Sequence, residues 1–365
     1  MRVAVAMSGG VDSTASALLL KKAGFDVIGL HMRLHPHSDA VARNAGYAAG
    51  QIGVPLFVFD LSADFRNLVV EPFLREYSRG RTPSPCPLCN RLIKTTLLFE
   101  RARELGCEKL ATGHYARIEH TAGLPSLLRA LDRAKDQSYF LFTLTTEILE
   151  RTLLPLGRYT KTYVREFLRS EGVTLIHDEE SQELCFIPDN DYKAFLKRHA
   201  VVSRPGPIVD LEGNVLGRHG GICDYTVGQR RGLGICGPMP HYVVRIDPDT
   251  NVVVVGTREQ TYSSTVRISA INSLEPQCLI PGARFEVKIR STASPVPCTL
   301  INASKDSLDL AFDTPQSAVA PGQAAVLYVG NRVACGGWIG ETDHQACTND
   351  LQVRQYGGTS LQSLI

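Results

Sequence analysis

The stretch Met7-Ser8-Gly9-Gly10-Val11-Asp12-Ser13 decides how this chain begins to fold. It follows a short apolar run, Arg2 to Met7, and precedes an Ala- and Leu-rich run, Thr14 to Lys22. Two adjacent glycines let backbone N–H groups approach an anion closely, and a helix that starts there offers its positive end. The two serines add hydroxyl donors, and Asp12 can hold Mg²⁺ against phosphate oxygens. The stretch therefore predicts a strand, a phosphate-binding turn and a helix, rather than an ordinary turn.

Further strands and helices alternate after this turn. We expect strands at Asp26 to Met32, Pro55 to Asp60 and Lys109 to Thr112, and helices at Asp39 to Gln51, Asp64 to Arg79 and Ile93 to Leu105. Alternation at these lengths predicts a parallel sheet with helices on both faces. Residues 1–200 are thus expected to form a doubly wound α/β domain that binds its ligand beyond the carboxyl ends of the strands.

The pattern changes after about residue 200. Pro205, Pro207 and several glycines interrupt the helical periodicity, so we expect a small central domain over residues 201–258. Short β-rich runs between turn residues then predict a C-terminal antiparallel β-barrel over residues 259–348, followed by a polar tail over residues 349–365. The expected barrel strands include Phe285 to Arg290, Ser307 to Phe312 and Ala324 to Val329.

The composition excludes several classes of protein. Of 365 residues, 44% are hydrophobic and 21% charged, which excludes a disordered or collagen-like chain. No apolar run approaches the ~18–20 residues that span a bilayer, and the first residues lack the apolar segment of a signal peptide. We therefore expect a soluble, cytoplasmic protein with no membrane partner. The net charge of +2 neither requires nor excludes nucleic acid, because phosphate affinity depends on a local basic patch.

Two glycine motifs need to be distinguished. The first is not a Walker loop, because no Gly-Lys-Ser/Thr occurs in the chain. SGGVDS instead resembles the pyrophosphate loop of the N-type ATP pyrophosphatases, which transfer AMP to a carbonyl oxygen. The second, Gly232 to Gly237, matches GxGxxG by letter, but Pro238 follows where a helix should begin. We interpret it as a loop.

Ten cysteines are too dilute for a disulfide scaffold in a chain of this length. Cys86 and Cys89 form a Cys-x-x-Cys pair, which we expect in a proline-stiffened loop directly before a helix that begins at Arg91. A thiol at a helix N-terminus has a lowered pKa, and its thiolate is the reactive form. A zinc site is the alternative, but no second Cys-x-x-Cys or His-x-x-x-His pair completes it. Cys185, taken alone, is typical of a core residue.

Seven stretches resemble the bacterial tRNA-specific 2-thiouridylase family in order and spacing, and with Ala320-Pro-Gly-Gln323 they extend over nearly the whole chain. They are SGGVDS, Gly29-Leu-His-Met32-Arg, the cysteine segment Thr82 to Lys94, Thr112-Gly-His114-Tyr-Ala-Arg, Lys135-Asp-Gln137-Ser-Tyr-Phe-Leu, Ser181-Gln-Glu-Leu-Cys185-Phe-Ile and Tyr225-Thr-Val-Gly-Gln229-Arg-Arg-Gly-Leu-Gly.

The resemblance implies an ATP-dependent sulfurtransferase that adenylates the C2 carbonyl oxygen of uridine 34 in the tRNAs for Lys, Glu and Gln, and then places sulfur at C2. It implies that Cys185 carries a persulfide and that Cys89 completes sulfur release, ending in a Cys89–Cys185 disulfide. With Cys86 and Asp12, these form the candidate catalytic set. The implied ATP contacts are Ala6, Met7, Ser8, Gly9, Gly10, Val11, Asp12, Ser13, Met32 and Gly113. The implied tRNA contacts are Ser84, Pro85, Cys86, His114, Lys135, Asp136, Gln137, Arg290, Ser291 and Gln323.

Two departures from the family pattern leave the chemistry open. Many members have Asp where this chain has Cys86, so water or Asp178/Glu179 would have to act as acid and base. Alternatively, Cys86, Cys89 and Cys185 hold a [4Fe–4S] cluster that takes up exogenous sulfide, in place of a persulfide from a donor protein. The second departure is the short segment Arg33 to Asp39, where relatives carry a longer loop.

Two other functions share part of these features. An amide-forming synthetase would use the same glycine loop, but it has no need of paired cysteines. A non-catalytic RNA-binding protein would have no reason to keep SGGVDS together with Cys89 and Cys185. An RNA partner would also give a role to a cluster of basic residues as a backbone track, namely Lys193, Lys197, Arg198, Arg204, Arg218, Arg230 and Arg231.

Overall fold

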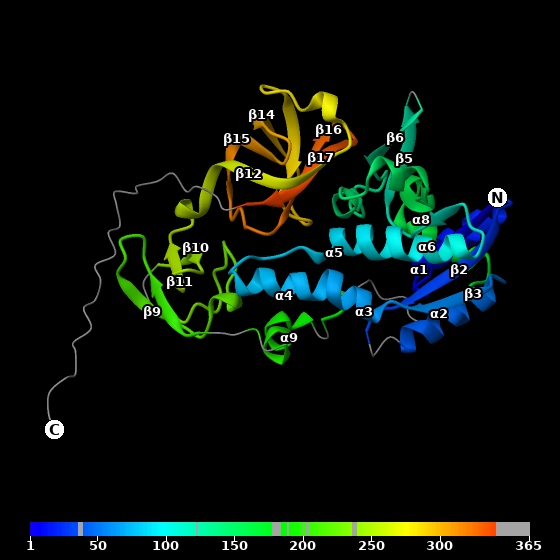
Figure 1. The fold of residues 1–365 in the computed structure, drawn as a ribbon, viewed down its shortest axis with the longest axis horizontal. Coiled ribbons are helices and arrows are strands. Elements are labelled where there is room, and N and C mark those ends of the chain that lie inside the picture. Colours follow the sequence, from blue (N-terminus) through cyan, green and yellow to red (C-terminus); the bar gives the residue numbers. More distant parts are fainter. Residues whose placement is uncertain are drawn as a thin grey trace.

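The computed structural model describes residues 1–35, 39–121, 123–176, 184–187, 190–199, 201, 204–235 and 239–340. They form an α/β domain, a small central sheet and a β-barrel, with the barrel above the helices that follow the third strand (Figure 1). Among these residues, no helix is long and apolar enough to cross a membrane.

A five-stranded sheet in the order β3-β2-β1-β4-β7 forms the centre of the α/β domain, and all its pairings are parallel. Val3, Ala4 and Val5 are fully buried, as expected of a strand covered on both faces. The strands are β1 (Arg2–Ala6), β2 (Asp26–Arg33), β3 (Leu56–Asp60), β4 (Lys109–Ala111) and β7 (Thr152–Leu153).

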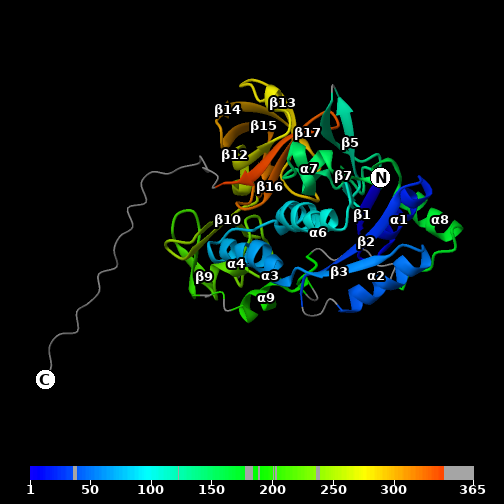
Figure 2. The ribbon, with the colours of Figure 1, turned by 45° about the vertical axis from the view of Figure 1, so that its right-hand side comes forward.

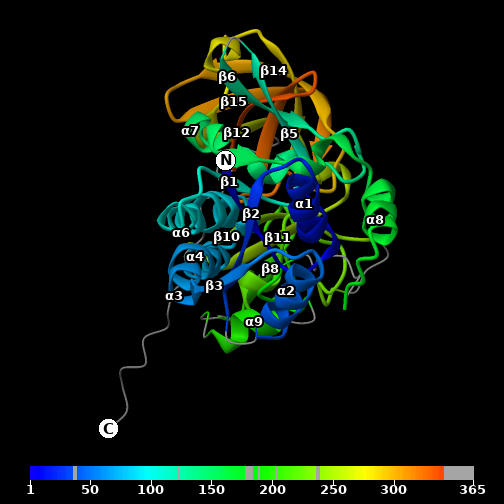
Figure 3. The ribbon, with the colours of Figure 1, turned by 90° about the vertical axis from the view of Figure 1, so that its right-hand side faces the viewer.

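Helices cover both faces of this sheet. On one face α1 (Val11–Lys22), α2 (Asp39–Gln51) and α8 (Lys161–Ser170) pack against Val3 and Val5, while α6 (Leu98–Glu104) packs against Ala4 on the other. Figure 3 shows the two groups on opposite sides of the strands. The predicted doubly wound α/β class is confirmed.

The helix that carries the cysteine pair begins earlier than expected. It starts with α5 (Pro85–Leu88), continues through a π-helical segment, η2 (Cys89–Leu97), and ends with α6. Proline at the first helical position costs nothing, because its missing N–H would have no partner within the helix. Cys86 and Cys89 therefore lie on the helix, and the predicted loop before Arg91 is wrong. The preceding helical run comprises α3 (Ser62–Phe65), η1 (Arg66–Val70) and α4 (Glu71–Ser78).

The second half of the chain is built from strands, and the predicted barrel is confirmed. The central sheet has the order β10-β11-β8-β9, and the barrel β12-β15-β14-β13-β16-β17 closes through pairing of β12 with β17. The bounds are β8 (Gly206–Val209), β9 (Val215–His219), β10 (Tyr242–Asp247), β11 (Val252–Gly256), β12 (Tyr262–Ser273), β13 (Arg284–Lys288), β14 (Val296–Ala303), β15 (Ser307–Ser317), β16 (Ala324–Val329) and β17 (Arg332–Ile339). The two short helices α7 (Thr146–Glu150) and α9 (Tyr192–Arg198) precede them in the chain.

A hairpin of the α/β domain joins the barrel sheet, which the sequence analysis missed. Strands β5 (Ala116–Thr121) and β6 (Leu124–Arg129) pair with each other, and Leu128 pairs with Arg332 of β17. Figure 2 shows β5 reaching up beside the barrel. The Tyr139 hydroxyl also donates to the Ala324 carbonyl at 2.8 Å, so the barrel is anchored on the α/β domain.

Candidate active site

The glycine turn lies between β1 and α1 at the carboxyl edge of the sheet. Gly9 has φ +81°, and a Cβ there would lie 2.5 Å from the backbone carbon of Asn44 in α2, so only glycine fits. Gly10 caps α1 without a side-chain hydrogen bond. The first N–H groups of α1 are thus left for a ligand, an arrangement that suits a phosphate.

The two serines of the turn form hydrogen bonds within the turn itself. The Ser13 hydroxyl donates to the Gly10 carbonyl at 3.1 Å and accepts from the Ser8 backbone N–H at 3.2 Å. The Ser8 and Ser13 hydroxyl oxygens lie 3.3 Å apart. In this structure the serines, which we expected to be phosphate donors, hold the shape of the loop.

Asp12 is held by two groups that the sequence analysis did not identify. Its Oδ1 accepts from Lys161 Nζ at 2.6 Å and from the Tyr115 hydroxyl at 2.8 Å. The Lys161 side chain is only 13% exposed, so its charge is poorly screened by water. Lys161 begins α8, where Thr160 caps the helix. The packing of α8 on α1 brings Lys161 beside Asp12, and no pattern in the nearby sequence predicts that contact.

The remaining expected nucleotide contacts lie on both sides of β1. Met32 is the second-to-last residue of β2 and Gly113 follows β4, and these two strands are the neighbours of β1 in the sheet. A Cβ on Gly113 would lie 2.9 Å from the backbone carbon of Asp12, so the chain passes in direct contact with the first turn of α1. The buried His31 ring supports the turn from below, since its Nδ1 lies 2.8 Å from the Met7 carbonyl oxygen. The expected contacts therefore gather at one edge of the sheet.

A small cavity of about 70 Å³ brings the three candidate cysteines together. Cys86 and Cys89 reach it from the helix, and Cys185 reaches it from a separate segment. Lys94 supplies the ammonium group of the lining, and the apolar part includes Leu34, Phe65, Val69, Leu184 and Phe186. Cys86, Cys89 and Cys185 are free thiols.

Burial makes these thiols weak acids, contrary to our expectation for a helix N-terminus. It raises the pKa of Cys89 to about 12 and also raises the pKa values of Cys86 and Cys185. Cys185 is exposed as a residue, but it lines the cavity, and burial still raises the pKa of its thiol. The Lys94 ammonium acts in the opposite direction on all three thiols. Desolvation of the thiolate outweighs the Lys94 charge, so the shift of these pKa values is opposite in direction to the prediction.

The π-helical segment explains why Lys94 reaches this cavity. Cys89 and Lys94 are five positions apart, a spacing that points in different directions on an α-helix but nearly the same direction on a π-helix. The Thr95 hydroxyl donates to the Asn90 carbonyl at 2.9 Å, which spans the same five positions. The wider helical turn thus places a positive charge beside the thiols.

Comparison with known proteins adds the family. Family models match residues 1–189 (tRNA methyl transferase HUP domain), 193–257 (tRNA methyl transferase PRC-barrel domain) and 263–339 (aminomethyltransferase beta-barrel domain). The chain is 45% identical to the tRNA-specific 2-thiouridylase MnmA of Geobacter metallireducens, over 93% of this chain and 96% of that protein. It is 44% identical to the MnmA of Magnetococcus marinus, over 93% and 98%.

This chain belongs to the MnmA family. The expected family resemblance is thereby confirmed. Among solved structures, the U34-tRNA thiolase NcsA of Methanococcus maripaludis with its [4Fe-4S] cluster has a TM-score of 0.35 at 16% identity, covering 55% of this chain and 65% of that one. A likeness that low carries no argument about the chemistry of this MnmA-family chain.

The expected iron–sulfur alternative is not favoured for this MnmA-family chain. Within the part of the chain that the structure describes, no group of three or more His, Cys, Asp or Glu side chains could hold a metal ion. The three cysteines as placed do not fit a cluster, and we derive no step through one. Asp178 and Glu179, the expected substitutes for an acid/base carboxylate, lie outside the described residues.

Several expected tRNA contacts of this MnmA-family chain have hydrogen-bond partners within the chain. The Gln137 side chain accepts from the Tyr115 N–H, and the Gln323 amide donates to the Thr82 carbonyl, at 2.9 and 2.8 Å. Arg290 donates to two carbonyls at the end of β15, that of Ser317, its last residue, at 2.6 Å and that of Ala318 at 2.8 Å.

Two further expected tRNA contacts, Asp136 and His114, also have partners within the chain. Asp136 accepts from Ala130 N–H at 2.9 Å and from the Ser138 hydroxyl, so it shapes its own loop. His114 Nδ1 lies 2.7 Å from the Thr112 hydroxyl, and burial together with the Lys94 charge lowers the pKa of His114 well below its usual value. Ser291 is exposed, whereas Pro85 is buried and Ser84 and Lys135 are half-buried.

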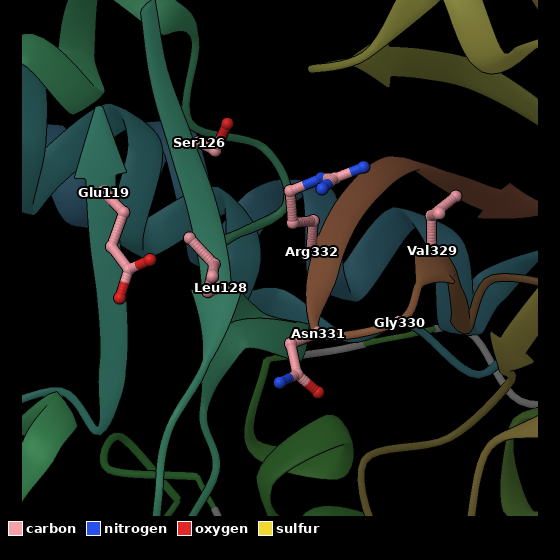
Figure 4. Close-up of a pocket in the computed structure, with 7 residues that line it drawn as sticks. All are labelled: Glu119, Ser126, Leu128, Val329, Gly330, Asn331 and Arg332. Atoms are coloured by element: carbon pink, nitrogen blue, oxygen red, sulfur yellow. The ribbon is translucent and has the colours of Figure 1, made fainter. Parts of the chain in front are cut away.

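A larger cavity of about 430 Å³ lies elsewhere, where the β5–β6 hairpin meets β17 (Figure 4). Glu119, Ser126, Leu128, Val329, Gly330, Asn331 and Arg332 line it. None of the predicted site residues is among them. It is a feature of the joint between the hairpin and the barrel.

Proposed function

We propose that this protein forms 2-thiouridine at position 34 of the tRNAs for Lys, Glu and Gln, with release of AMP and pyrophosphate. Membership of the MnmA family supports tRNA 2-thiolation. The observation that carries the mechanism is the combination, in one fold, of a glycine turn suited to phosphate and a cavity lined by Cys89 and Cys185.

In the first step, the uracil O2 attacks the α-phosphorus of ATP, the bond to the bridging oxygen breaks, and pyrophosphate leaves. The N–H groups of the first turn of α1 bind phosphate oxygens, and Lys161 stands ready to neutralise charge beside them. Asp12 is suited to hold Mg²⁺ between itself and the phosphates, since magnesium is often bound through one carboxylate plus substrate phosphates. Bound there, Mg²⁺ would neutralise charge on the leaving pyrophosphate.

In the second step, the terminal sulfur of a persulfide on Cys185 attacks C2 of the adenylated base, forming a C–S bond. The Cys89 thiolate then attacks the Cys185 sulfur and breaks the S–S bond. The electron pair stays on the transferred sulfur, AMP leaves from C2, and the two cysteines end as a disulfide. The persulfide sulfur is reduced by two electrons and the two cysteine thiols supply them, so a dithiol reductant must restore the enzyme.

Cys86 changes how protons are handled in this scheme. Burial raises its pKa, so the thiol stays neutral and cannot supply the charge of the Asp found in many relatives. We propose that water carries the proton at this position. We propose that the sulfur donor is a persulfide-bearing protein, whose terminal sulfur is attacked by the Cys185 thiolate while the donor cysteine leaves as a thiol. Free sulfide cannot form this persulfide without a two-electron oxidant, so it serves as the negative control in the experiment below.

The base must leave its stack to reach both the glycine turn and the cysteines, as in other enzymes that act on a base. We propose that the segment from Ser84 to Cys86, together with His114 and Lys135, contacts the flipped nucleotide. Arg290 and Ser291 on the barrel would contact the RNA backbone, with Asp136, Gln137 and Gln323 shaping the loops between them.

The test is mass analysis of nucleosides from tRNA incubated with the enzyme, ATP and either a persulfide donor or sulfide, with and without oxygen. With the persulfide donor we expect 2-thiouridine at position 34 and one AMP per modified base, and with sulfide in the absence of oxygen we expect none. Cys185→Ser should still release pyrophosphate but lose thiolation by at least about a hundredfold, because it lacks the sulfur carrier. Cys278→Ser, on the barrel, is the matched control and should retain both activities. Appreciable 2-thiouridine from Cys185→Ser would contradict the scheme.

A further inference from the structure

Thr82 lies three residues before α5, the start of the helix that carries Cys86 and Cys89. Its polar groups form hydrogen bonds to other parts of the molecule. Its backbone N–H donates to the Pro321 carbonyl at 2.9 Å, and its own carbonyl accepts from the Gln323 amide at 2.8 Å. Its hydroxyl donates to the Thr226 hydroxyl at 3.0 Å. The first two partners lie on the barrel, in the turn before β16, and the third lies in the loop before β10 of the central sheet.

Glycines let the backbones meet closely at the same place. Gly80 has φ +67°, and a Cβ there would lie 2.5 Å from the Ile246 side chain of β10. Gly322 has φ +89°, and its Cβ would lie 3.1 Å from the Thr82 carbonyl oxygen. Such close contacts leave the link between α4 and α5 little room to shift. Figure 1 shows this link running between the central sheet and the barrel.

The segment between Thr82 and the thiols is stiff. Pro83 and Pro85 fix two of its three intervening φ angles, and Cys86 follows directly. Beyond the thiols the helix is held within the α/β domain, because the buried Asn90 amide donates to the Phe140 carbonyl at 3.0 Å. A movement of the Thr82 backbone would therefore be passed on to Cys86 and Cys89 through this stiff segment.

We propose that Thr82 is a positioning residue for sulfur transfer, through which the central sheet and the barrel set the place of Cys86 and Cys89. This inference rests on the proposed thiolation. It assigns to Gln323 a role in the protein itself, in addition to the expected contact with tRNA. Thr82 acts on the sulfur step and not on adenylation, because its contacts lie on the cysteine side of the site and not at the glycine turn.

The test uses the hydroxyl pair, which can be removed from either side. Thr82→Val and Thr226→Val should each lower the single-turnover rate of 2-thiouridine formation about threefold to tenfold, the range for one lost hydrogen bond. Pyrophosphate release with tRNA and ATP, without a sulfur donor, should stay within about twofold of the unmutated enzyme. The double variant should be no slower than either single one, because both remove the same bond. Thr82→Ser keeps the hydroxyl and should restore the rate.

Thr152→Val is the control, since the buried Thr152 hydroxyl donates to the Ile148 carbonyl within the α/β domain, whereas the half-buried Thr82 hydroxyl bonds to the central domain. It should leave the ratio of thiolation to adenylation unchanged. Equal losses of both steps in Thr82→Val, additive losses in the double variant, or an unchanged thiolation rate would overturn the proposal.

A second readout does not depend on activity. In Thr82→Val the buried Cys89 should be labelled by iodoacetamide about threefold to tenfold faster than in Thr152→Val, because its helix is less firmly held. Equal labelling rates in the two variants would overturn the positioning role of Thr82, whether or not the enzyme makes 2-thiouridine. Failure of the unmutated enzyme to make 2-thiouridine would contradict only the proposed function.

Discussion

The glycine turn and the cysteine cavity are the two halves of the proposed site, and they are built in opposite ways. The turn comes from one continuous stretch, and its charged residue, Asp12, already has a lysine and a tyrosine hydroxyl as partners. The cavity brings together thiols from two segments far apart in the sequence, and burial favours their neutral form. Lys94 is the ammonium in its lining.

The glycine turn is therefore preorganised for its ligand, whereas the thiols of the cavity are not yet in their reactive form. A phosphate site needs N–H groups and cations in fixed places, and the folded chain provides them before ATP arrives. A sulfur site needs a thiolate, which a dry cavity disfavours unless a cation compensates. We therefore expect changes at the turn to abolish activity, and changes at the cavity to alter its pH dependence.

The largest expected effect is at Asp12. Asp12→Ala should lower pyrophosphate release by at least about a hundredfold, because it removes the carboxylate that faces the phosphates and leaves Lys161 without its partner. The measurement is the rate of pyrophosphate release with saturating tRNA. Asp64→Ala removes an exposed carboxylate in the first turn of α3 and serves as the control. Near-normal release from Asp12→Ala would remove the phosphate role from the turn.

The next effect tests how tightly the turn is packed. Gly113→Ala would place a Cβ 2.9 Å from the Asp12 backbone, so α1 must shift and the Kd for ATP should rise about tenfold. Gly46→Ala in α2 meets nothing within 4 Å and should leave ATP binding unchanged, with a gain in stability of about 0.5–1 kcal/mol. Calorimetric titration with a non-hydrolysable ATP analogue measures both. Equal affinities for the two variants would mean that the turn tolerates movement.

A smaller effect is expected when the charge beside the thiols is removed. Lys94 lowers the pKa values of the cavity thiols, so Lys94→Met should raise them and move the alkylation profile of Cys185 up by as much as about one pH unit. At neutral pH the rate of Cys185 alkylation in Lys94→Met should therefore fall about threefold to tenfold. Lys94→Arg keeps the charge and should stay close to the unmutated protein. A profile that does not move in Lys94→Met would show that Lys94 does not act on the thiols.

The smallest effect concerns His114, which lies between the two halves. Burial and the Lys94 charge lower its pKa, so the unfolded chain binds a proton below about pH 6.5 while the folded chain does not. Stability should therefore fall as the pH drops from 7.5 to 5.5, by up to about 1.4 kcal/mol per pH unit. His114→Gln should reduce this fall. Thr112→Val removes the bond to His114 but keeps the titrating ring, and should lower the melting temperature equally at both pH values.

Several features of the fold could be predicted because local residues determine them. SGGVDS joins a buried strand to a helix, and Gly9 is required there whatever surrounds it. The barrel followed from short strands between turn residues. The β5–β6 hairpin was missed although Ile118 alternates with Arg117 and Glu119 and Gly123 lies between the strands, a pattern typical of a hairpin.

The parallel sheet and the strand, glycine turn and helix at its start could be predicted from the sequence alone, since they depend on residues close together in the chain. Only the tertiary structure decided that Lys161 and Tyr115 hold Asp12, that Lys94 faces the thiols, and that Thr82 joins three parts of the molecule. The physical reason is that pKa values and hydrogen-bond partners depend on burial and on charges brought close by packing. No local pattern records those distances.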